Sequence, residues 1–267
     1  MIRKPAVAGQ FYPSNPKVLK REVMSYFDSG LDRKRAKGIV SPHAGYIYSG
    51  RVCGEVFSRV EIPDHVIVLG PNHRGMGASA SIMADGVWDM PLGVVEIDKD
   101  LSERILKQSS IISDDPQAHN FEHSLEVQLP FMQVIKEDFL LTPIALGSLS
   151  ISECLILGEE IASAIGDLGE DVLIVASSDM THYEPVEYAK AQDQEAIDEI
   201  LRLDPEGVYD TVRKRGITMC GYIPVAVMLK AAVELGAKEA ELIDYMTSGD
   251  TSGDYRSVVG YAGLIVY

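Results

Sequence analysis

The chain has 267 residues, of which 46% are hydrophobic, so it is long enough to bury a sizeable core in one large α/β domain. Its 40 acidic residues outnumber 24 basic ones and give a net charge of −16, which argues against nucleic acid as a partner. No apolar run approaches the roughly 18–20 residues that span a bilayer, and the basic N-terminus lacks the apolar stretch of a signal peptide. We therefore expect no membrane partner and a cytoplasmic protein with a single domain over 1–267.

Short apolar runs bounded by Gly, Pro or Ser alternate along the chain with longer amphipathic segments. The runs predict strands at 38–40, 66–69, 139–146, 172–176, 241–246 and 258–266, with a strand or extended arm at 5–11 and an antiparallel hairpin within 79–97 whose loop holds Trp88 and Pro91. The amphipathic segments predict helices at 14–27, 50–57, 99–107, 152–165, 185–201, 205–214 and 225–235. This order predicts an α/β protein: three α/β/α layers around a central mixed, mainly parallel sheet.

Histidines follow three of the predicted strands within a few residues. The strand at 66–69 leads to His73, the strand at 38–40 to His43, and the strand at 172–176 to His182. Central parallel strands are buried on both faces, and ligands of open α/β sheets bind beyond the carboxyl ends of such strands. We therefore expect these imidazoles at one edge of the sheet, with His43 and His73 on neighbouring strands.

A further histidine, His123, lies in the segment AHNFEHSLEVQLPF at 118–131. Asn120 resembles a helix N-cap, which would place His123 and Glu126 in the first turn of a helix and His119 just before it. The three cysteines form no CxxC pair and are expected to be reduced thiols. Cys220 precedes the apolar helix at 225–235, where the helix dipole favours a thiolate.

Two imidazoles and a soft or anionic third ligand would give a divalent transition metal a three-point anchor with open positions. His43 and His73 are the predicted imidazoles, and Cys220, Asp179 and His182 are the alternatives for the third ligand. Asp179 and His182 lie three residues apart on one loop, so they could instead orient ligands or act as acid and base.

Covalent catalysis is a second interpretation of the same residues. Cys220 with a histidine would make a thiol and imidazole pair, and Ser177-Ser178-Asp179 with His182 offers a hydroxyl, a carboxylate and a base. No GxSxG elbow surrounds these serines, however, and a serine beside an aspartate on one turn rarely has triad geometry. The metal interpretation therefore ranks above the covalent one.

Seven segments, in order and spanning nearly the whole chain, together resemble the Memo family: VAGQFYP, SPHAGYIYSG, VLGPNHRG, EHSLEVQLPF, SSDMTHY, CGYIPVAVML and TSGDTSGDYRSVVGYAG. The loop SGDTSGD resembles the prokaryotic branch of that family. The family's fold is similar to that of the class III extradiol ring-cleaving dioxygenases, which hold non-haem Fe(II) with two histidines and a carboxylate. The resemblance therefore implies a metal pocket of that kind.

By this resemblance, His43 and His73 are the two imidazole ligands, and Cys220 stands where those dioxygenases carry a glutamate. The resemblance also places His123, Asp179 and His182 around the same pocket, as the catalytic residues. A thiolate in place of a carboxylate suits softer ions, including Cu and Zn, and would change the oxygen chemistry of an iron centre. Together with the Fe(II) of the resembling dioxygenases, this makes Fe(II) or Cu the expected cofactor, with Zn as a further option.

Three classes of function fit these residues. The first is a metal-dependent redox enzyme, similar to a dioxygenase, with a site made of two histidines and one cysteine. The second is a binding module that holds a small molecule or peptide in a pocket without turnover. The third is a zinc or thiol hydrolase. Metal content and dioxygen uptake separate the first class from the second, and metal identity with thiol labelling separates the third.

Overall fold

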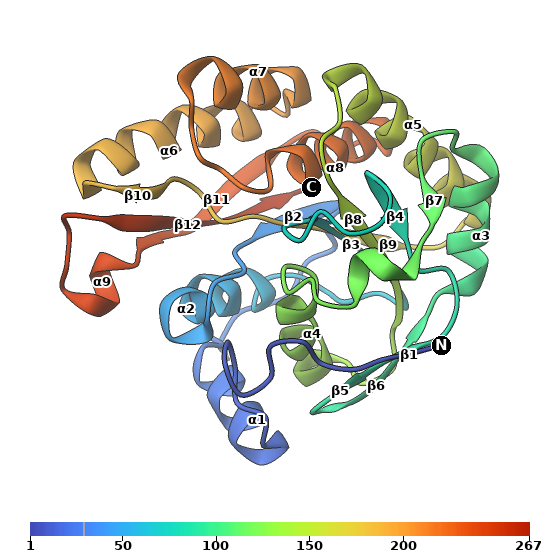
Figure 1. Ribbon diagram of the computed structural model, residues 1–267, viewed down its shortest axis with the longest axis horizontal. Helices are drawn as coiled ribbons and strands as arrows, with labels where there is room; N and C mark the ends of the chain where they lie inside the picture. Colours follow the sequence, from blue (N-terminus) through green and yellow to red (C-terminus); the bar gives the residue numbers. More distant parts are fainter. Residues whose placement is uncertain (29) are drawn as a thin grey trace.

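A mixed sheet with parallel central strands lies between two helical layers, which confirms the predicted fold class (Figure 1). The computed structural model describes residues 1–28 and 30–267. Within these residues the sheet has twelve strands, and its main path runs β1-β5-β6-β8-β3-β9-β2-β12-β10. Strand β11 pairs with β12, β4 pairs with β8, and β7 pairs with β4. The four central strands β8, β3, β9 and β2 are all parallel.

The strands are β1 (Ile2–Arg3), β2 (Gly38–Ser41), β3 (His65–Pro71), β4 (Ala80–Ile82), β5 (Val87–Met90), β6 (Gly93–Ile97), β7 (Ser113–Asp114), β8 (Leu140–Leu146), β9 (Val172–Ser177), β10 (His182–Glu184), β11 (Ala240–Thr247) and β12 (Val258–Val266). The helices are α1 (Pro16–Ser25), α2 (Tyr46–Phe57), α3 (Lys99–Gln108), α4 (Leu129–Ile135), α5 (Ile151–Leu168), α6 (Val186–Leu201), α7 (Pro205–Arg215), α8 (Tyr222–Glu234) and α9 (Gly249–Ser252). Two 3-10 turns are η1 (Pro116–His119) and η2 (Glu126–Gln128). Among the helices of the described residues, none has the length and apolarity needed to span a membrane.

Strand β3 divides its side chains between two hydrophobic cores. Ile67 and Leu69 pack with residues of α5, α7 and α8, whereas Val66 and Val68 pack with residues of α1, α2 and α4. Figure 1 shows these two groups of helices on opposite faces of the sheet. Because successive side chains of a strand point to opposite faces, a strand covered on both faces is apolar on both, as β3 is from Val66 to Leu69.

Helix α5 shows how local signals fix the ends of an element. The Ser150 hydroxyl accepts a hydrogen bond from the Glu153 N–H, and the Glu153 carboxylate accepts one from the Ser150 N–H at 2.7 Å, which forms a capping box. At the other end Gly169 takes a left-handed conformation with φ 75°, which glycine adopts without strain. The predicted helix at 152–165 is therefore present, and slightly longer than predicted.

Two predictions for the amino-terminal half are wrong. Trp88 lies within β5 and not in the hairpin loop, because its fully buried ring packs against the Arg3 guanidinium, 4.1 Å from the ring centroid. Residues 5–11 form bends and turns instead of the predicted strand or extended arm, since the N–H groups of Ala6 and Val7 donate to the buried Glu126 carboxylate instead of to a neighbouring strand.

The prediction of a helix starting at Asn120 is also wrong. Asn120 ends the short turn η1, and the α-helix of this region begins only at Leu129. The Glu122 carboxylate accepts hydrogen bonds from the N–H groups of His123 and Ser124, so it holds this backbone in a loop that competes with helix formation. His119 and His123 therefore share no helix face.

Candidate metal centre

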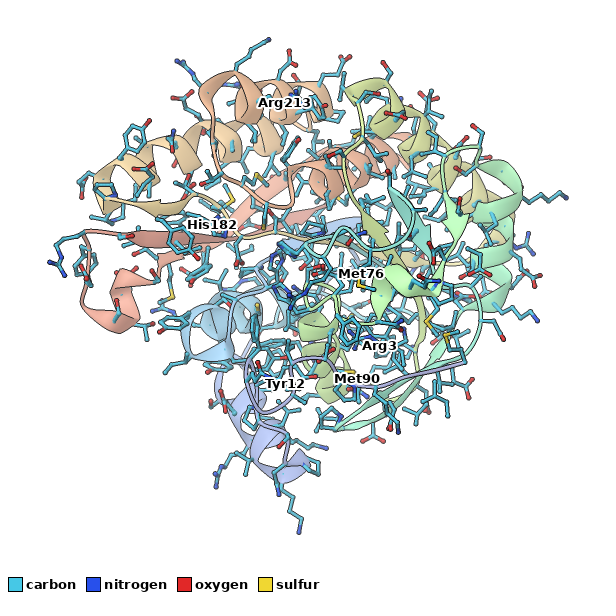
Figure 2. The ribbon with its side chains drawn as sticks, viewed as in Figure 1. Arg3, Tyr12, Met76, Met90, His182 and Arg213 are labelled. Atoms are coloured by element: carbon cyan, nitrogen blue, oxygen red, sulfur yellow. The ribbon has the colours of Figure 1, made fainter. Side chains whose placement is uncertain are left out.

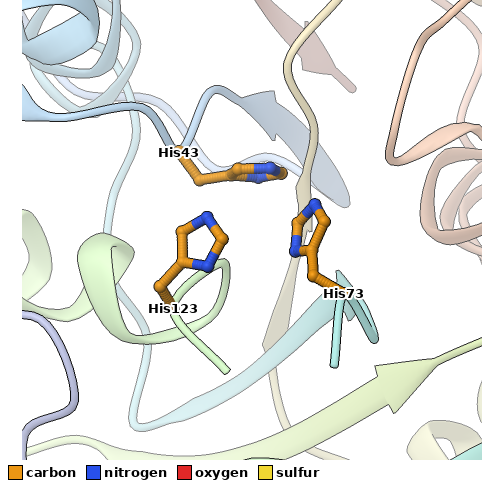
Figure 3. A group of neighbouring side chains, drawn as sticks. All are labelled: His43, His73 and His123. Atoms are coloured by element: carbon orange, nitrogen blue, oxygen red, sulfur yellow. The ribbon is translucent and has the colours of Figure 1, made fainter. Parts of the chain in front are cut away.

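Three histidines from separate segments converge beyond the carboxyl ends of the central strands (Figure 3). His43 follows β2, His73 follows β3, and His123 lies in the loop between η1 and η2. Each offers one ring nitrogen to a group in which these atoms all lie within 4.8 Å of one another. The edge-on rings of His43 and His73 have centroids 5.2 Å apart, and the stacked rings of His73 and His123 have centroids 4.8 Å apart. A single ion of ordinary size fits such a group.

The two predicted imidazole ligands do not come from neighbouring strands, as the sequence had suggested. Strand β9 lies between β2 and β3 and pairs with both in parallel. His43 and His73 still meet because all three strands end at the same edge of the sheet, and because the loops after β2 and β3 turn toward each other over the end of β9.

Cys220 brings a sulfur next to His43, although within the described residues the close group itself consists of His43, His73 and His123. Its Sγ lies 3.1 Å from His43 Nε2 and accepts a hydrogen bond from the Asp179 N–H at 3.3 Å. The next residue must be small, because a Cβ at Gly221 would lie 2.4 Å from the Ser177 carbonyl oxygen. Burial raises the pKa of the Cys220 thiol, so a positive charge beside it would be needed to hold the thiolate at neutral pH.

Cys220 and His73 line one cavity of about 410 Å³. The remaining walls come from the loop after β3, from the segment after β8 and from the start of α8, at residues Pro71, Asn72, Gly75, Gly77, Ala78, Ser79, Leu146, Gly147, Ser148, Tyr222 and Ile223. A volume of this size is typical of small-molecule sites. The sulfur and one imidazole thus face an open space in which a small molecule fits.

The Glu122 carboxylate fixes the position of His73 by hydrogen bonds. Glu122 is fully buried, and its carboxylate accepts hydrogen bonds from the His73 N–H at 2.7 Å and from His73 Nδ1 at 2.9 Å. The same carboxylate accepts from the N–H groups of His123 and Ser124. Because a carboxylate only accepts, His73 must carry a proton on Nδ1, so Nε2 is the nitrogen that the neutral ring would offer to a metal.

The buried imidazoles are neutral at physiological pH. Burial lowers the pKa of His43 well below its usual value, and the neighbouring His123 and His73 lower it further. Burial also lowers the pKa of His123 to about 4. Neutral imidazole is the form that binds metals, so the environment prepares both rings for ligation without a change of protonation.

Asp179 and His182 approach the cluster from the segment that follows β9. Asp179 accepts a hydrogen bond from the His43 N–H at 2.7 Å, and burial raises the pKa of its carboxyl to about 6. His182 donates from its Nδ1 to the Thr218 carbonyl oxygen at 2.9 Å, so Nε2 is the ring nitrogen that this bond leaves available. Figure 2 shows His182 beside the strands at the edge of the sheet that carries β10 and β12.

The sequence prediction missed Glu122, although it lies next to His123. An acidic residue beside a candidate ligand is a weak signal by itself, since most glutamates lie at the surface. What distinguishes Glu122 is its contact with His73, which is 49 residues away along the chain. Only the folded structure brings these two residues together.

The fold and the donor atoms define an α/β protein with a histidine-rich candidate metal centre at the carboxyl edge of its central strands. The chain belongs to the family of Memo-like proteins, which it matches over residues 3–265. This confirms the resemblance seen in the sequence.

Similar proteins occur in archaea and bacteria. A MEMO1 family protein of Methanothermobacter thermautotrophicus is 42% identical, over 99% of this chain and 100% of the relative. One from Aquifex aeolicus is 42% identical, over 99% of this chain and 98% of the relative. Among solved structures, an uncharacterized Escherichia coli K12 protein matches with a TM-score of 0.61 at 13% identity, over 85% of this chain and 98% of that one. At this identity the likeness concerns the fold alone.

Proposed function

We propose that the chain is a metal-dependent redox enzyme, similar to a dioxygenase, that holds one Fe(II) or Cu ion with His43, His73 and Cys220. The observation that carries this proposal is the close group of three imidazoles, with the Cys220 sulfur 3.1 Å from His43 Nε2 and beside a cavity. Nitrogen and sulfur donors suit iron and copper better than they suit Mg²⁺ or Ca²⁺. When bound, the ion would supply a redox centre next to the cavity.

The other residues of the site have separate tasks in this proposal. His123 is close enough to the two imidazoles to act as a further ligand or as an acid or base. Asp179 and His182 would move protons, since the Asp179 carboxyl has a raised pKa and the His182 ring is held by its Nδ1, with Nε2 outside that hydrogen bond. The substrate would be a small molecule or the end of a peptide, in keeping with the volume of the cavity.

A zinc hydrolase is the second candidate, and the group of three histidines favours it. Three protein ligands with an open fourth position are the usual arrangement of catalytic zinc, and three imidazoles form one of the common ligand sets. In this alternative His123 replaces Cys220 as the third ligand. A binding module without turnover would use the same cavity and would need no redox ion.

Metal analysis of the anaerobically purified protein tests the proposal. We expect about one equivalent of Fe or Cu per chain, and uptake of dioxygen when the metal-loaded protein is exposed to air with a suitable reductant. His73→Gln should abolish stoichiometric binding. His65→Gln is the matched control, because His65 begins the same strand β3 at its opposite end and pairs with Asp98. Tightly held zinc without iron or copper would favour the hydrolase, and absence of dioxygen uptake would contradict the redox proposal.

Alkylation of Cys220 tests the third ligand. Cys220 lines the cavity, so a small alkylating reagent should reach it in metal-free protein and label it slowly, because burial raises the pKa of its thiol. Once Fe(II) or Zn²⁺ is added anaerobically, labelling should be several-fold slower still, because the metal occupies the sulfur. Cys53 and Cys154 are fully buried internal controls whose labelling should not respond to metal. Equal labelling of Cys220 in both states would refute its assignment as a ligand and leave His123 in that position.

A further inference from the structure

We propose that Ser177 sets the tautomer of His43: its hydroxyl, oriented by the Ser124 carbonyl and the Gln128 amide, forces the imidazole to carry its proton on Nδ1. Ser177 is thereby a positioning residue that directs the His43 Nε2 lone pair toward the centre of the cluster. The inference deepens the proposed function, because its purpose rests on a metal at this site. The hydrogen-bond argument itself rests only on the contacts of the metal-free protein.

Ser177 ends β9, the strand that lies between those leading to His43 and His73. Its side chain is fully buried, and its Oγ has three polar neighbours. The Ser124 carbonyl oxygen lies at 2.7 Å, Gln128 Nε2 at 2.9 Å and His43 Nδ1 at 2.9 Å. A serine hydroxyl has one proton to donate and two lone pairs to accept with, so these three contacts use its full capacity.

The direction of each bond follows from what the neighbours can do. A carbonyl oxygen only accepts, so the single Ser177 proton goes to Ser124. The Gln128 amide nitrogen only donates, so it occupies one lone pair of the Ser177 oxygen. The remaining lone pair faces His43 Nδ1, and this contact is a hydrogen bond only if that nitrogen carries a proton.

The orientation of the Gln128 amide is itself fixed. Its Nε2 lies 2.8 Å from the Pro42 carbonyl oxygen and 3.3 Å from the Ser41 carbonyl oxygen. Exchanging the amide nitrogen and oxygen would bring the oxygen against these two carbonyl oxygens, with no proton between them. Because Gln128 is fully buried, water could not relieve that repulsion.

The protonated Nδ1 leaves the lone pair of His43 on Nε2, the atom that lies 3.1 Å from Cys220 Sγ. His73 reaches the same tautomer in a different way, through the Glu122 carboxylate. The two candidate ligands therefore differ in the charge of the group behind them: a neutral hydroxyl supports His43, and an anion supports His73. A ligating histidine commonly donates its other ring N–H in this manner, which fixes both the tautomer and the ring orientation.

Nitrogen-15 NMR of the metal-free protein at neutral pH tests the inference directly. Long-range proton to nitrogen correlations identify the protonated nitrogen of each imidazole, and the spectrum of His43→Gln assigns the His43 signals. We expect a proton on Nδ1 and a bare Nε2 in the wild-type protein. In Ser177→Ala, which removes the acceptor, His43 should show a mixture of tautomers or a proton on Nε2. A wild-type His43 protonated on Nε2, or an unchanged tautomer in Ser177→Ala, would overturn the inference.

Two variants separate this role from a general loss of packing. Ser177→Thr retains the hydroxyl and should restore the Nδ1 proton. Ser124→Ala is the matched control: it removes a buried hydroxyl that donates to the Pro71 carbonyl at 3.1 Å, and it keeps the Ser124 carbonyl that Ser177 needs. Its His43 signals should match the wild type. Should Ser177→Ala fail to fold, the wild-type tautomer and the Ser177→Thr spectrum still decide the question.

A Zn²⁺ titration against a competing chelator measures the consequence for the site. Ser177→Ala should bind Zn²⁺ about 10–100-fold more weakly than the wild type, as is usual when the partner of a ligating histidine is removed. Ser124→Ala should bind with wild-type affinity. Equal affinities of Ser177→Ala and wild type would overturn the positioning role. If the wild type binds no metal at all, the proposed function fails while the tautomer result stands by itself.

Discussion

Replacing Arg3 by methionine is expected to lower the free energy of unfolding by about 3–5 kcal/mol, because the change leaves the carboxylate of Glu126 buried without its counter-charge. Arg3 is 3% exposed and Glu126 is fully buried, and the two side chains form an ion pair. Water cannot replace the lost guanidinium at such a position. The loss should therefore be far larger than for an exposed ion pair.

The Arg3–Glu126 ion pair also connects the amino-terminal segment of the chain to the region that carries His123. The guanidinium of Arg3 also donates to the carbonyl oxygens of His119 at 3.0 Å and Glu122 at 2.7 Å. Glu126 in turn accepts from the Tyr12 hydroxyl at 2.5 Å. Figure 2 shows Arg3 and Tyr12 on the same side of the sheet. Loss of Arg3 should therefore disturb the position of the loop that carries His123, as well as lower the free energy of unfolding.

Urea denaturation of three variants measures the effect. Arg35→Met is the matched control, since Arg35 pairs with Asp171 at 2.6 Å at the surface, where an ion pair contributes about 0–1 kcal/mol. Arg3→Lys keeps the charge but lacks the planar guanidinium that reaches two carbonyl groups. Its loss of unfolding free energy should therefore lie between those of Arg3→Met and Arg35→Met. Equal losses for Arg3→Met and Arg35→Met would contradict the argument.

The sequence predicted the elements whose signals are local. Val66 to Leu69 of β3 are all apolar, and α5 has an amphipathic sequence, so both elements were predicted near their true bounds. The placement of His43 and His73 at one edge of the sheet followed from the rule that parallel strands end together. The sequence pattern left Cys220, Asp179 and His182 as alternatives for the third ligand, and only the family resemblance singled out Cys220.

What the sequence did not predict depends on contacts between distant segments. The order of strands in the sheet placed β9 between β2 and β3, and no local pattern encodes that order. Likewise, Asn120 has the features of a helix cap, but Glu122 binds the N–H of His73 from another loop and keeps the backbone out of a helix. In both cases tertiary contacts overrode local propensity.

The second large effect is expected for Glu122→Gln, which should weaken Zn²⁺ or Fe(II) binding about 10–100-fold and also destabilise the fold by about 1–3 kcal/mol. Burial alone would raise the pKa of Glu122, but the hydrogen bonds from His73 and Ser124 outweigh it and hold the pKa at about 2. The group is therefore a carboxylate at any pH above about 4, with four N–H donors directed at it. A glutamine of the same shape would turn an N–H₂ group toward some of these donors.

Metal affinity and unfolding free energy should be measured on the same samples, with Glu137→Gln as the control for removing one negative charge at an exposed position. The control matters because the chain carries a net charge of −16, which attracts cations in general. Glu137→Gln should leave both the metal affinity and the unfolding free energy close to wild type. Raising the salt concentration should not change the ratio of the metal affinities of Glu122→Gln and Glu137→Gln, since buried contacts are screened weakly. If Glu122→Gln loses affinity only as much as Glu137→Gln does, Glu122 contributes through general charge and not by orienting His73. If the affinity falls while His73 keeps its proton on Nδ1, the loss comes from a displaced loop instead of a changed tautomer.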